Sequence, residues 1–182
     1  HSITLQDCVL RGNQASALGG GIYSRGSVSL TRCTLERNTA ANGGGLYNLI
    51  GPIRVFDSTF RGNTAWDSGG AAFNEAGDGS IELQNSTLSG NRAGSRGGAF
   101  YNRFGHINLL HATVAFNSAP SGGGGIHQEQ PHPYPGVDFR NTILAFNSPA
   151  NGGGNTGRII DGGGNVVTDG SIAIPSSRSG DP

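Results

Sequence analysis

The sequence contains no Lys and no Met, and it is poor in charge. Only 13% of its 182 residues are charged, all twelve basic residues are Arg, and the formal net charge is zero. Because no basic patch is interleaved with aromatic residues, a nucleic-acid partner is not expected. No apolar stretch approaches the about 20 residues that a membrane-spanning helix needs. Since a reading frame starts with Met, its absence indicates a processed product or an internal fragment.

Cysteine is also scarce, with Cys8 and Cys33 at equivalent positions of consecutive repeats. The favoured interpretation is a pair of stacked, buried thiols. A disulfide is the alternative, since strands of neighbouring coils lie about 4.8 Å apart. The two residues therefore leave the redox compartment open.

Glycine, by contrast, is abundant, and its 33 copies punctuate a six-fold repeat. Each copy has an alternating apolar run, an Asn and a glycine cluster, and a period of roughly 25–30 residues indicates a stacked solenoid. The Asn residues are Asn13, Asn38, Asn63, Asn91, Asn117 and Asn147. Asn tolerates a left-handed backbone and bonds backbone groups at turns. We therefore expect a structural turn ladder, whose stacked members also bond each other.

Apolar residues alternate with period two, which predicts strands with one buried face. The coils start near Ile3, Val28, Ile53, Ile81, Ile107 and Val137. Two consecutive outward residues, such as Thr31 and Arg32, predict a bend within each coil. The sequence therefore predicts an all-β parallel β-helix of about six coils, one domain over residues 1–174, followed by a polar tail over 175–182. A leucine-rich repeat is the alternative, disfavoured because its inner leucine positions hold small residues and its second half is rich in glycine.

An aromatic column runs beside the apolar column that begins at Ile22. Its members are Tyr23, Tyr47, Phe73 and Tyr101. Neighbours in a strand face opposite sides, so one column is exposed unless a glycine corner turns both inward. An exposed stripe of this kind would be an interaction surface. We therefore take the aromatic column as a candidate contact surface.

An insertion over residues 127–136 adds His127, Glu129, His132 and Tyr134 to this candidate contact surface. His and carboxylate side chains also ligate zinc. However, the three prolines of the insertion indicate a stiff surface loop. We therefore expect a contact loop, with no metal and no cofactor.

A polysaccharide-cleaving site would need carboxylates on neighbouring coils, with a pair about 5–9.5 Å apart. The best column in the sequence is Asp7, Arg32 and Asp57, in which an arginine separates the two acids. Such a column is typical of an exposed ion ladder. We therefore predict no catalytic residues and a protein that is not an enzyme.

Short motifs in the chain match those of a known repeat family. The segments 43–48 (GGGLYN), 69–74 (GGAAFN) and 97–102 (GGAFYN) resemble a GGA-(I/L)-(Y/F)-N motif, and 60–63 (FRGN) matches F-x-x-N. Together they resemble the polymorphic outer membrane protein repeats, and the end of the chain is similar to CSLREAI or choice-of-anchor proteins. The resemblance covers residues 3 to roughly 175. It implies a right-handed, pectin-lyase-like parallel β-helix of a bacterial surface, secreted or associated with the outer membrane.

We therefore expect a non-catalytic extracellular or cell-surface module, structural or adhesive, that contacts a protein or a surface glycan. The alternatives are a β-helix protein that binds or cleaves polysaccharide, and an accessory subunit of a larger assembly. Ile3 starts a strand with no capping helix before it. Since an unpaired strand edge is a template for pairing, upstream coils or a partner chain are expected to cover this N-terminal edge.

Overall fold

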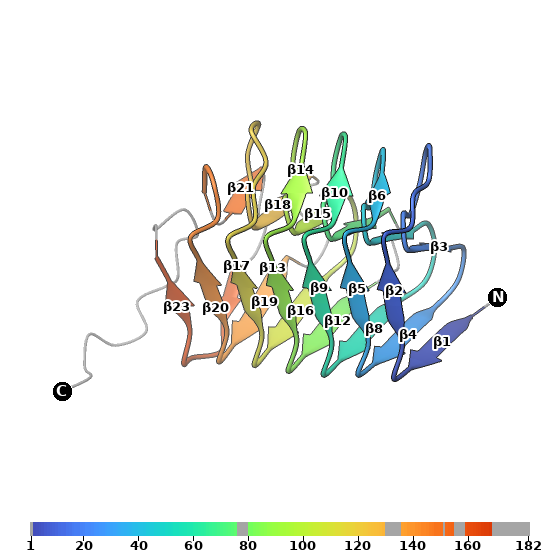
Figure 1. The fold of residues 1–182 in the computed structure, drawn as a ribbon. Helices are drawn as coiled ribbons and strands as arrows, with labels where there is room; N and C mark the ends of the chain where they lie inside the picture. Colours follow the sequence, from blue (N-terminus) through green and yellow to red (C-terminus); the bar gives the residue numbers. More distant parts are fainter. Residues whose placement is uncertain (1, 76–79, 130–135, 151, 155–158, 169–182) are drawn as a thin grey trace.

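The computed structural model of the chain is a parallel β-solenoid of about six turns. The structure describes residues 2–75, 80–129, 136–150, 152–154 and 159–168. Every strand pair in these ranges is parallel, and each strand pairs with its counterpart in the next coil, with β1 and β23 at opposite ends of the stack (Figure 1). These ranges contain no helix, so the β-helix prediction is confirmed and the leucine-rich alternative is wrong.

Four sheets run along the solenoid. The first contains β1 (Ile3–Gln6), β4 (Val28–Thr31), β8 (Ile53–Phe56), β12 (Ile81–Gln84), β16 (Ile107–Leu110), β19 (Val137–Arg140) and β22 (Ile159–Asp161). The second contains β2 (Val9–Arg11), β5 (Thr34–Glu36), β9 (Thr59–Arg61), β13 (Thr87–Ser89), β17 (Thr113–Ala115), β20 (Ile143–Ala145) and β23 (Val166–Val167). The third is short, with β6 (Thr39–Ala40), β10 (Thr64–Ala65) and β14 (Arg92–Ala93). The fourth contains β3 (Ile22–Ser24), β7 (Leu46–Asn48), β11 (Ala72–Asn74), β15 (Phe100–Asn102), β18 (Ile126–Gln128) and β21 (Gly152–Gly154).

The apolar columns of the sequence form the core between these sheets. The register stacks Val28 on Ile53 and Leu30 on Val55, and all four side chains are buried. Successive residues of a strand face opposite sides, so the alternating pattern sends one column inward in every coil. Removing this apolar surface from water is the main stabilising contribution to the stack, at roughly 25 cal/mol for each Å² buried.

The bend between the first and second sheets lies where two outward residues follow each other. The second of these residues has a left-handed backbone in every described coil, with φ near +50°: Asp7, Arg32, Asp57, Asn85, His111 and Asn141. The next residue then points inward, as Cys33 and Ser58 do. Cys8 and Cys33 are free thiols, so the disulfide alternative is not realised.

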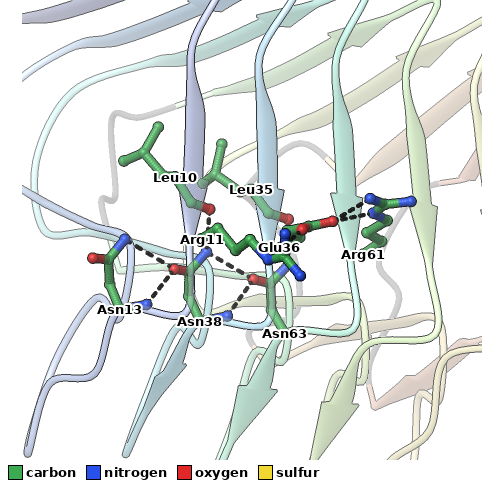
Figure 2. A network of polar contacts seen from close by, with 8 residues as sticks. All are labelled: Leu10, Arg11, Asn13, Leu35, Glu36, Asn38, Arg61 and Asn63. Carbon is green, nitrogen blue, oxygen red and sulfur yellow. Dashed lines mark hydrogen bonds and ion pairs between the residues drawn. The ribbon is translucent and has the colours of Figure 1, made fainter.

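The Asn ladder follows the second sheet, and its hydrogen bonds join one coil to the next. The Oδ1 atom of Asn38 accepts from the backbone N–H of Asn13 at 2.9 Å and from its Nδ2 at 3.1 Å, while Asn38 Nδ2 donates to the carbonyl of Leu10 at 2.9 Å (Figure 2). The same set repeats between Asn38 and Asn63, and so on along the stack. The left-handed residue is the one before each Asn rather than the Asn itself, as at Arg37. The Asn side chain is instead turned inward, where it satisfies backbone groups that the turn leaves unpaired.

The glycine clusters allow neighbouring coils to approach each other closely just before the fourth sheet. A Cβ on Gly44 would lie 2.5 Å from the carbonyl oxygen of Gly70, and one on Gly70 would lie 2.2 Å from that of Gly98. Both distances are shorter than any real Cβ contact, so a larger residue would push the coils apart. Glycine is required here because of close backbone approach.

The two ends of the stack differ in what can be described. At the N-terminal end, residues 2–11 form β1 and β2, and Ile3, Leu5 and Leu10 are only half-buried against the core. The covering of this edge by further coils or a partner chain stays a prediction. The polar tail over 175–182 lies outside the described residues. In the part of the chain that is described, no helix is long and apolar enough to cross a membrane.

Candidate binding groove

A second ladder of buried amides runs along the fourth sheet, one residue after the aromatic column. Nδ2 of Asn48 donates to Oδ1 of Asn74 at 3.2 Å, Nδ2 of Asn74 to Oδ1 of Asn102 at 2.8 Å, and Nδ2 of Asn102 to Oε1 of Gln128 at 2.7 Å. Asn102 Nδ2 also donates to the carbonyl of Gly105 at 2.9 Å, which holds the following turn. Sequence reasoning missed this ladder, although the Asn that ends each GGxxYN motif was its signal.

The aromatic column forms one continuous stack over these strands. Ring centroids are 4.9 Å apart from Tyr47 to Phe73, 4.5 Å from Phe73 to Tyr101 and 5.2 Å from Tyr101 to His127. Tyr47, Phe73, Tyr101 and His127 are buried, whereas Tyr23 at the start of the stack is 41% exposed. Each ring covers the face of the next, and the column therefore presents its edges and hydroxyls to solvent rather than its ring faces.

A row of alternating charge lies beside the stack, one residue after the amide ladder. Arg103 Nη1 lies 2.6 Å from Oε1 of Glu75, and Arg103 Nε lies 3.2 Å from Oε2 of Glu129. Tyr47 donates its hydroxyl proton to Glu75. Arg103 therefore bridges the carboxylates of the coils on either side of its own. We call Glu75, Arg103 and Glu129 the charged row.

The charged row and the aromatic stack line one hollow of about 300 Å³. Its other lining residues come from the preceding turns: Asn42, Asp67 and Ser68. Asn42 Oδ1 accepts from the backbone N–H of Ser68 at 3.2 Å, which ties two of these turns together. The lining residues include three carboxylates and one guanidinium, and Arg96 adds a second positive charge beside Tyr101, so the hollow is net negative. We call this hollow the groove.

The tyrosine hydroxyls of the groove are held in their protonated form. Burial, followed by the neighbouring Glu129 carboxylate, raises the pKa of Tyr101 to about 12. Burial and then the hydrogen bond to Glu75 raise the pKa of Tyr47 further. The hydrogen bond to Glu75, and then the negative charges of Glu75 and Glu129, raise the pKa of Arg103 as well. Near neutral pH the groove therefore offers fixed donors and acceptors rather than a group ready to exchange a proton.

His127 ends the described part of the stack. Burial, and then the positive charge of Arg96, lower the pKa of its imidazole, while Glu129 acts in the opposite direction. Its Nδ1 atom is buried without a hydrogen-bond partner. His127 is therefore neutral at pH 7 and packs as an aromatic ring.

The structure brings six of the predicted contact residues into the groove or its stack: Tyr23, Tyr47, Phe73, Tyr101, His127 and Glu129. His132 and Tyr134 lie outside the described residues, so the three-ligand set of His127, Glu129 and His132 is not placed. Among the residues that are described, no group of three or more His, Cys, Asp or Glu side chains could hold a metal ion. That the column is a contact surface stays a prediction.

The exposed ion ladder that the sequence suggested lies outside the groove, at the bend after the first sheet. Arg32 donates from Nε to Oδ1 of Asp7 at 2.7 Å and from Nη2 to Oδ2 of Asp7 at 2.9 Å. Asp57 instead accepts from Nδ2 of Asn85 at 3.2 Å. The hydrogen bond from Arg32 holds the pKa of Asp7 below its usual range. Both partners of the Arg32–Asp7 pair are exposed, so it contributes little to stability.

Comparison with known proteins finds the Chlamydia polymorphic membrane protein (Chlamydia_PMP) repeat in two segments, residues 7–25 and 85–103. The two matches are equivalent pieces of different coils. Each begins at a left-handed corner residue, Asp7 or Asn85, and extends just beyond the aromatic strand, β3 or β15. No curated protein and no solved structure matches the chain.

The resemblance to the polymorphic outer membrane protein repeats is therefore confirmed in these two segments. The repeat unit that was matched contains the corner, the ladder Asn, the glycine cluster and the aromatic strand in one piece. The chain is a parallel β-solenoid that carries the Chlamydia polymorphic membrane protein repeat.

Proposed function

We propose that the chain is a non-catalytic, adhesive module of a bacterial cell surface, and that the groove binds a positively charged segment of a partner protein. The observation that carries this proposal is the charged row. Glu75 and Glu129 are fixed by ion pairs to Arg103, on strands that the amide ladder ties together. Groups held in place before binding lose little entropy when a ligand arrives, which favours recognition.

The chemistry of the groove supports binding rather than catalysis. An acid–base pair needs groups whose pKa values differ and lie near the working pH. Here the hydroxyls of Tyr47 and Tyr101 stay protonated because burial raises both pKa values. Arg103 also occupies the space between Glu75 and Glu129, where a hydrolase would place the water and the scissile bond.

The charge of the groove supports a cationic partner. Asp67, Glu75 and Glu129 outnumber Arg103 among its lining residues. Complementary charge across an interface accelerates encounter and suppresses binding of partners of the wrong sign. A neutral glycan would use the same hydroxyl and carboxylate groups, but it would gain nothing from the negative potential. A basic protein segment is therefore the first candidate, and a glycan is the second.

The test is a double substitution, Glu75→Gln with Glu129→Gln, and the probe is a fluorescein-labelled oligolysine peptide at low salt. Loss of two partly exposed charges should weaken binding about tenfold. The matched control, Asp57→Asn with Glu82→Gln, removes the same charge from the other side of the solenoid and should leave the dissociation constant nearly unchanged. Equal weakening in both variants would mean that only the net charge of the chain is felt.

A glycan array read with the same variants decides between the two partner classes. If the unsubstituted chain binds a neutral glycan, and the groove variant loses this binding while oligolysine binding is unaffected, the cationic partner is rejected. Circular dichroism of all variants controls for folding.

A further inference from the structure

A row of left-handed residues runs along the second sheet, directly before the buried Asn ladder. Its members are Gly12, Arg37, Gly62, Gly90, Phe116 and Phe146, with φ between +52° and +65°. The register is fixed by backbone bonds between coils, from Gly90 N–H to Ala115 O and from Phe116 N–H to Ala145 O. This conformation suits glycine, whereas an L-residue with a side chain pays about 1–2 kcal/mol for it. Phe116 and Phe146 therefore have a strained backbone, at positions where three other coils have glycine.

Burial does not offset this strain. Phe116 is 64% exposed and Phe146 is 66% exposed, and their rings stack on each other with centroids 5.2 Å apart and an angle of 13° between the planes. Ile143 and Val166, which pair across β20 and β23, add two more exposed apolar side chains. Strained backbone combined with an exposed apolar cluster is typical of a functional site rather than of a stabilising element.

The position beside Phe116 is empty. Phe146 covers one face of the Phe116 ring, so the other face points along the row toward Gly90. A Cβ placed on Gly90 would have nothing within 4 Å. Neighbouring coils are about 4.8 Å apart, which is also a stacking distance for two rings. A planar apolar group from outside can therefore continue the stack over Gly90.

The other half of the same row is positively charged. The side chain of Arg37 lies over Gly62: a Cβ placed on Gly62 would be 3.8 Å from Cγ of Arg37. Glu36 is buried between Arg11, at 2.8 Å from its carboxylate, and Arg61, and both arginine side chains are exposed (Figure 2). These residues and Gly62 line a shallow hollow of about 280 Å³. Three guanidinium groups face one carboxylate, so this hollow attracts an anionic group.

We propose that this row is a docking site for an extended polypeptide segment that carries one aromatic and one or more acidic side chains. The aromatic ring stacks on Phe116 over Gly90, and the acidic group lies against Arg37 and Arg61. The two positions are one or two coils apart, about 5–10 Å. An extended chain rises about 3.3 Å for each residue, so the acidic residue stands roughly two or three positions from the aromatic one.

The surroundings favour this occupant over a sugar or a second copy of the chain. A sugar needs polar groups around the stacked ring, whereas the large exposed side chains of β20 and β23 are the apolar Ile143 and Val166. Four exposed apolar side chains offer on the order of a few hundred Å². A stable dimer needs about 800 Å² from each partner. A short segment therefore fits the patch, whereas the patch is too small for a stable interface with a second folded copy of the chain.

The test substitutes both phenylalanines, Phe116→Gly with Phe146→Gly, which installs the residue that this row uses at Gly62 and Gly90. The fold should be retained and the melting temperature little changed. The variant loses the stacking of the two rings, but it also loses the backbone strain. The probes are three dye-labelled peptides: Glu-Glu-Gly-Trp, Glu-Glu-Gly-Ala and Gln-Gln-Gly-Trp, each with blocked ends. We expect the first peptide to bind the unsubstituted chain at least tenfold more tightly than the other two, and the double variant to lose this preference.

Several results would overturn the proposal. Equal binding of the first peptide to the double variant would do so, as would equal binding of all three peptides. Concentration-dependent dimerisation that the double variant abolishes, seen by sedimentation, would assign the face to self-association. Loss of binding in the control Tyr23→Ala, which removes an exposed aromatic residue of the fourth sheet, would place the peptide at the aromatic stack instead. The groove variant, Glu75→Gln with Glu129→Gln, should bind the first peptide normally, so this proposal and the proposed function can fail separately.

Discussion

Two rows of side chains run along the solenoid with one residue per coil, and they obey different rules. The buried ladder holds Asn in each of its coils, from Asn38 to Asn147. The outer row that contains Glu75, Arg103 and Glu129 begins instead with Arg25 and Leu49. A buried amide must bond the identical group of the next coil, so its identity is constrained by its own neighbours. An outer residue meets solvent, so it is free to carry chemistry specific to one part of the stack.

The largest effect should follow from breaking the buried ladder. Asn63→Ala removes an acceptor for the N–H and the side chain of Asn38, and it removes the donor to Leu35 O and to Asn91 Oδ1. Leaving several buried polar groups unpaired should lower the free energy of unfolding by about 3–5 kcal/mol. Asn108→Ala, at an exposed outward position, is the control and should cost about 0.5 kcal/mol or less. Urea denaturation measures both, and similar losses would contradict the distinction between the buried ladder and an exposed position.

A smaller effect should appear where the interior meets the groove, at the Tyr101 hydroxyl. Its pKa of about 12 lies above the unfolded value of about 10. Stability from this shift is therefore complete below pH 10 and is lost as the pH rises through 12, by up to about 2 kcal/mol. Tyr101→Phe should reduce the loss of stability between pH 9 and pH 11.5, as measured by chemical denaturation. If Tyr101→Phe loses as much stability over this pH range as the unsubstituted chain, the Tyr101 hydroxyl does not have a raised pKa in the folded state.

The smallest effect concerns His127, which faces Tyr101, Arg96 and Glu129. Its folded pKa lies below the unfolded value of about 6.5 because the ring is buried. Its contribution to stability is therefore complete above pH 6.5 and is lost as the pH falls through the folded pKa. His127→Phe should extend the aromatic stack, change stability at pH 7 by about 1 kcal/mol or less, and flatten the decline below pH 6.5.

The control for this substitution is His111→Asn, at the exposed bend where other coils already have Asn85 and Asn141. It should change the stability at pH 7 by about 0.5 kcal/mol or less. If the decline of stability below pH 6.5 becomes flatter in His111→Asn but not in His127→Phe, the acid sensitivity does not come from His127.

Most of the fold could be predicted from the sequence because its determinants are local and repeated. The alternation from Ile3 onward, the paired outward residues at Thr31 and Arg32, and the glycine clusters each recur with one period. Any register other than one coil per repeat would expose the apolar columns. The position of the left-handed residue was harder to predict. It falls one residue before each Asn and is occupied by residue types as different as Gly12, Arg37 and Phe116.

The candidate site was only partly predictable. The aromatic column was visible, but whether it was buried depended on how closely the glycine turns approach it, and that is a property of the packed coils. The charged row was not found, because Glu75, Arg103 and Glu129 are far apart in the sequence and resemble no repeated motif. Only the stacking of their coils places them side by side.

What the sequence determined by itself is therefore the stack: its period, its parallel pairing and the side chains that fill its core. These follow from patterns that each coil must satisfy alone and in contact with an identical neighbour. What only the tertiary structure decided is which unlike residues become neighbours across coils. Glu75 is bridged by Arg103, and Phe116 is left with one open face, because a spacing near 4.8 Å between coils brings together side chains that are 25 or more residues apart.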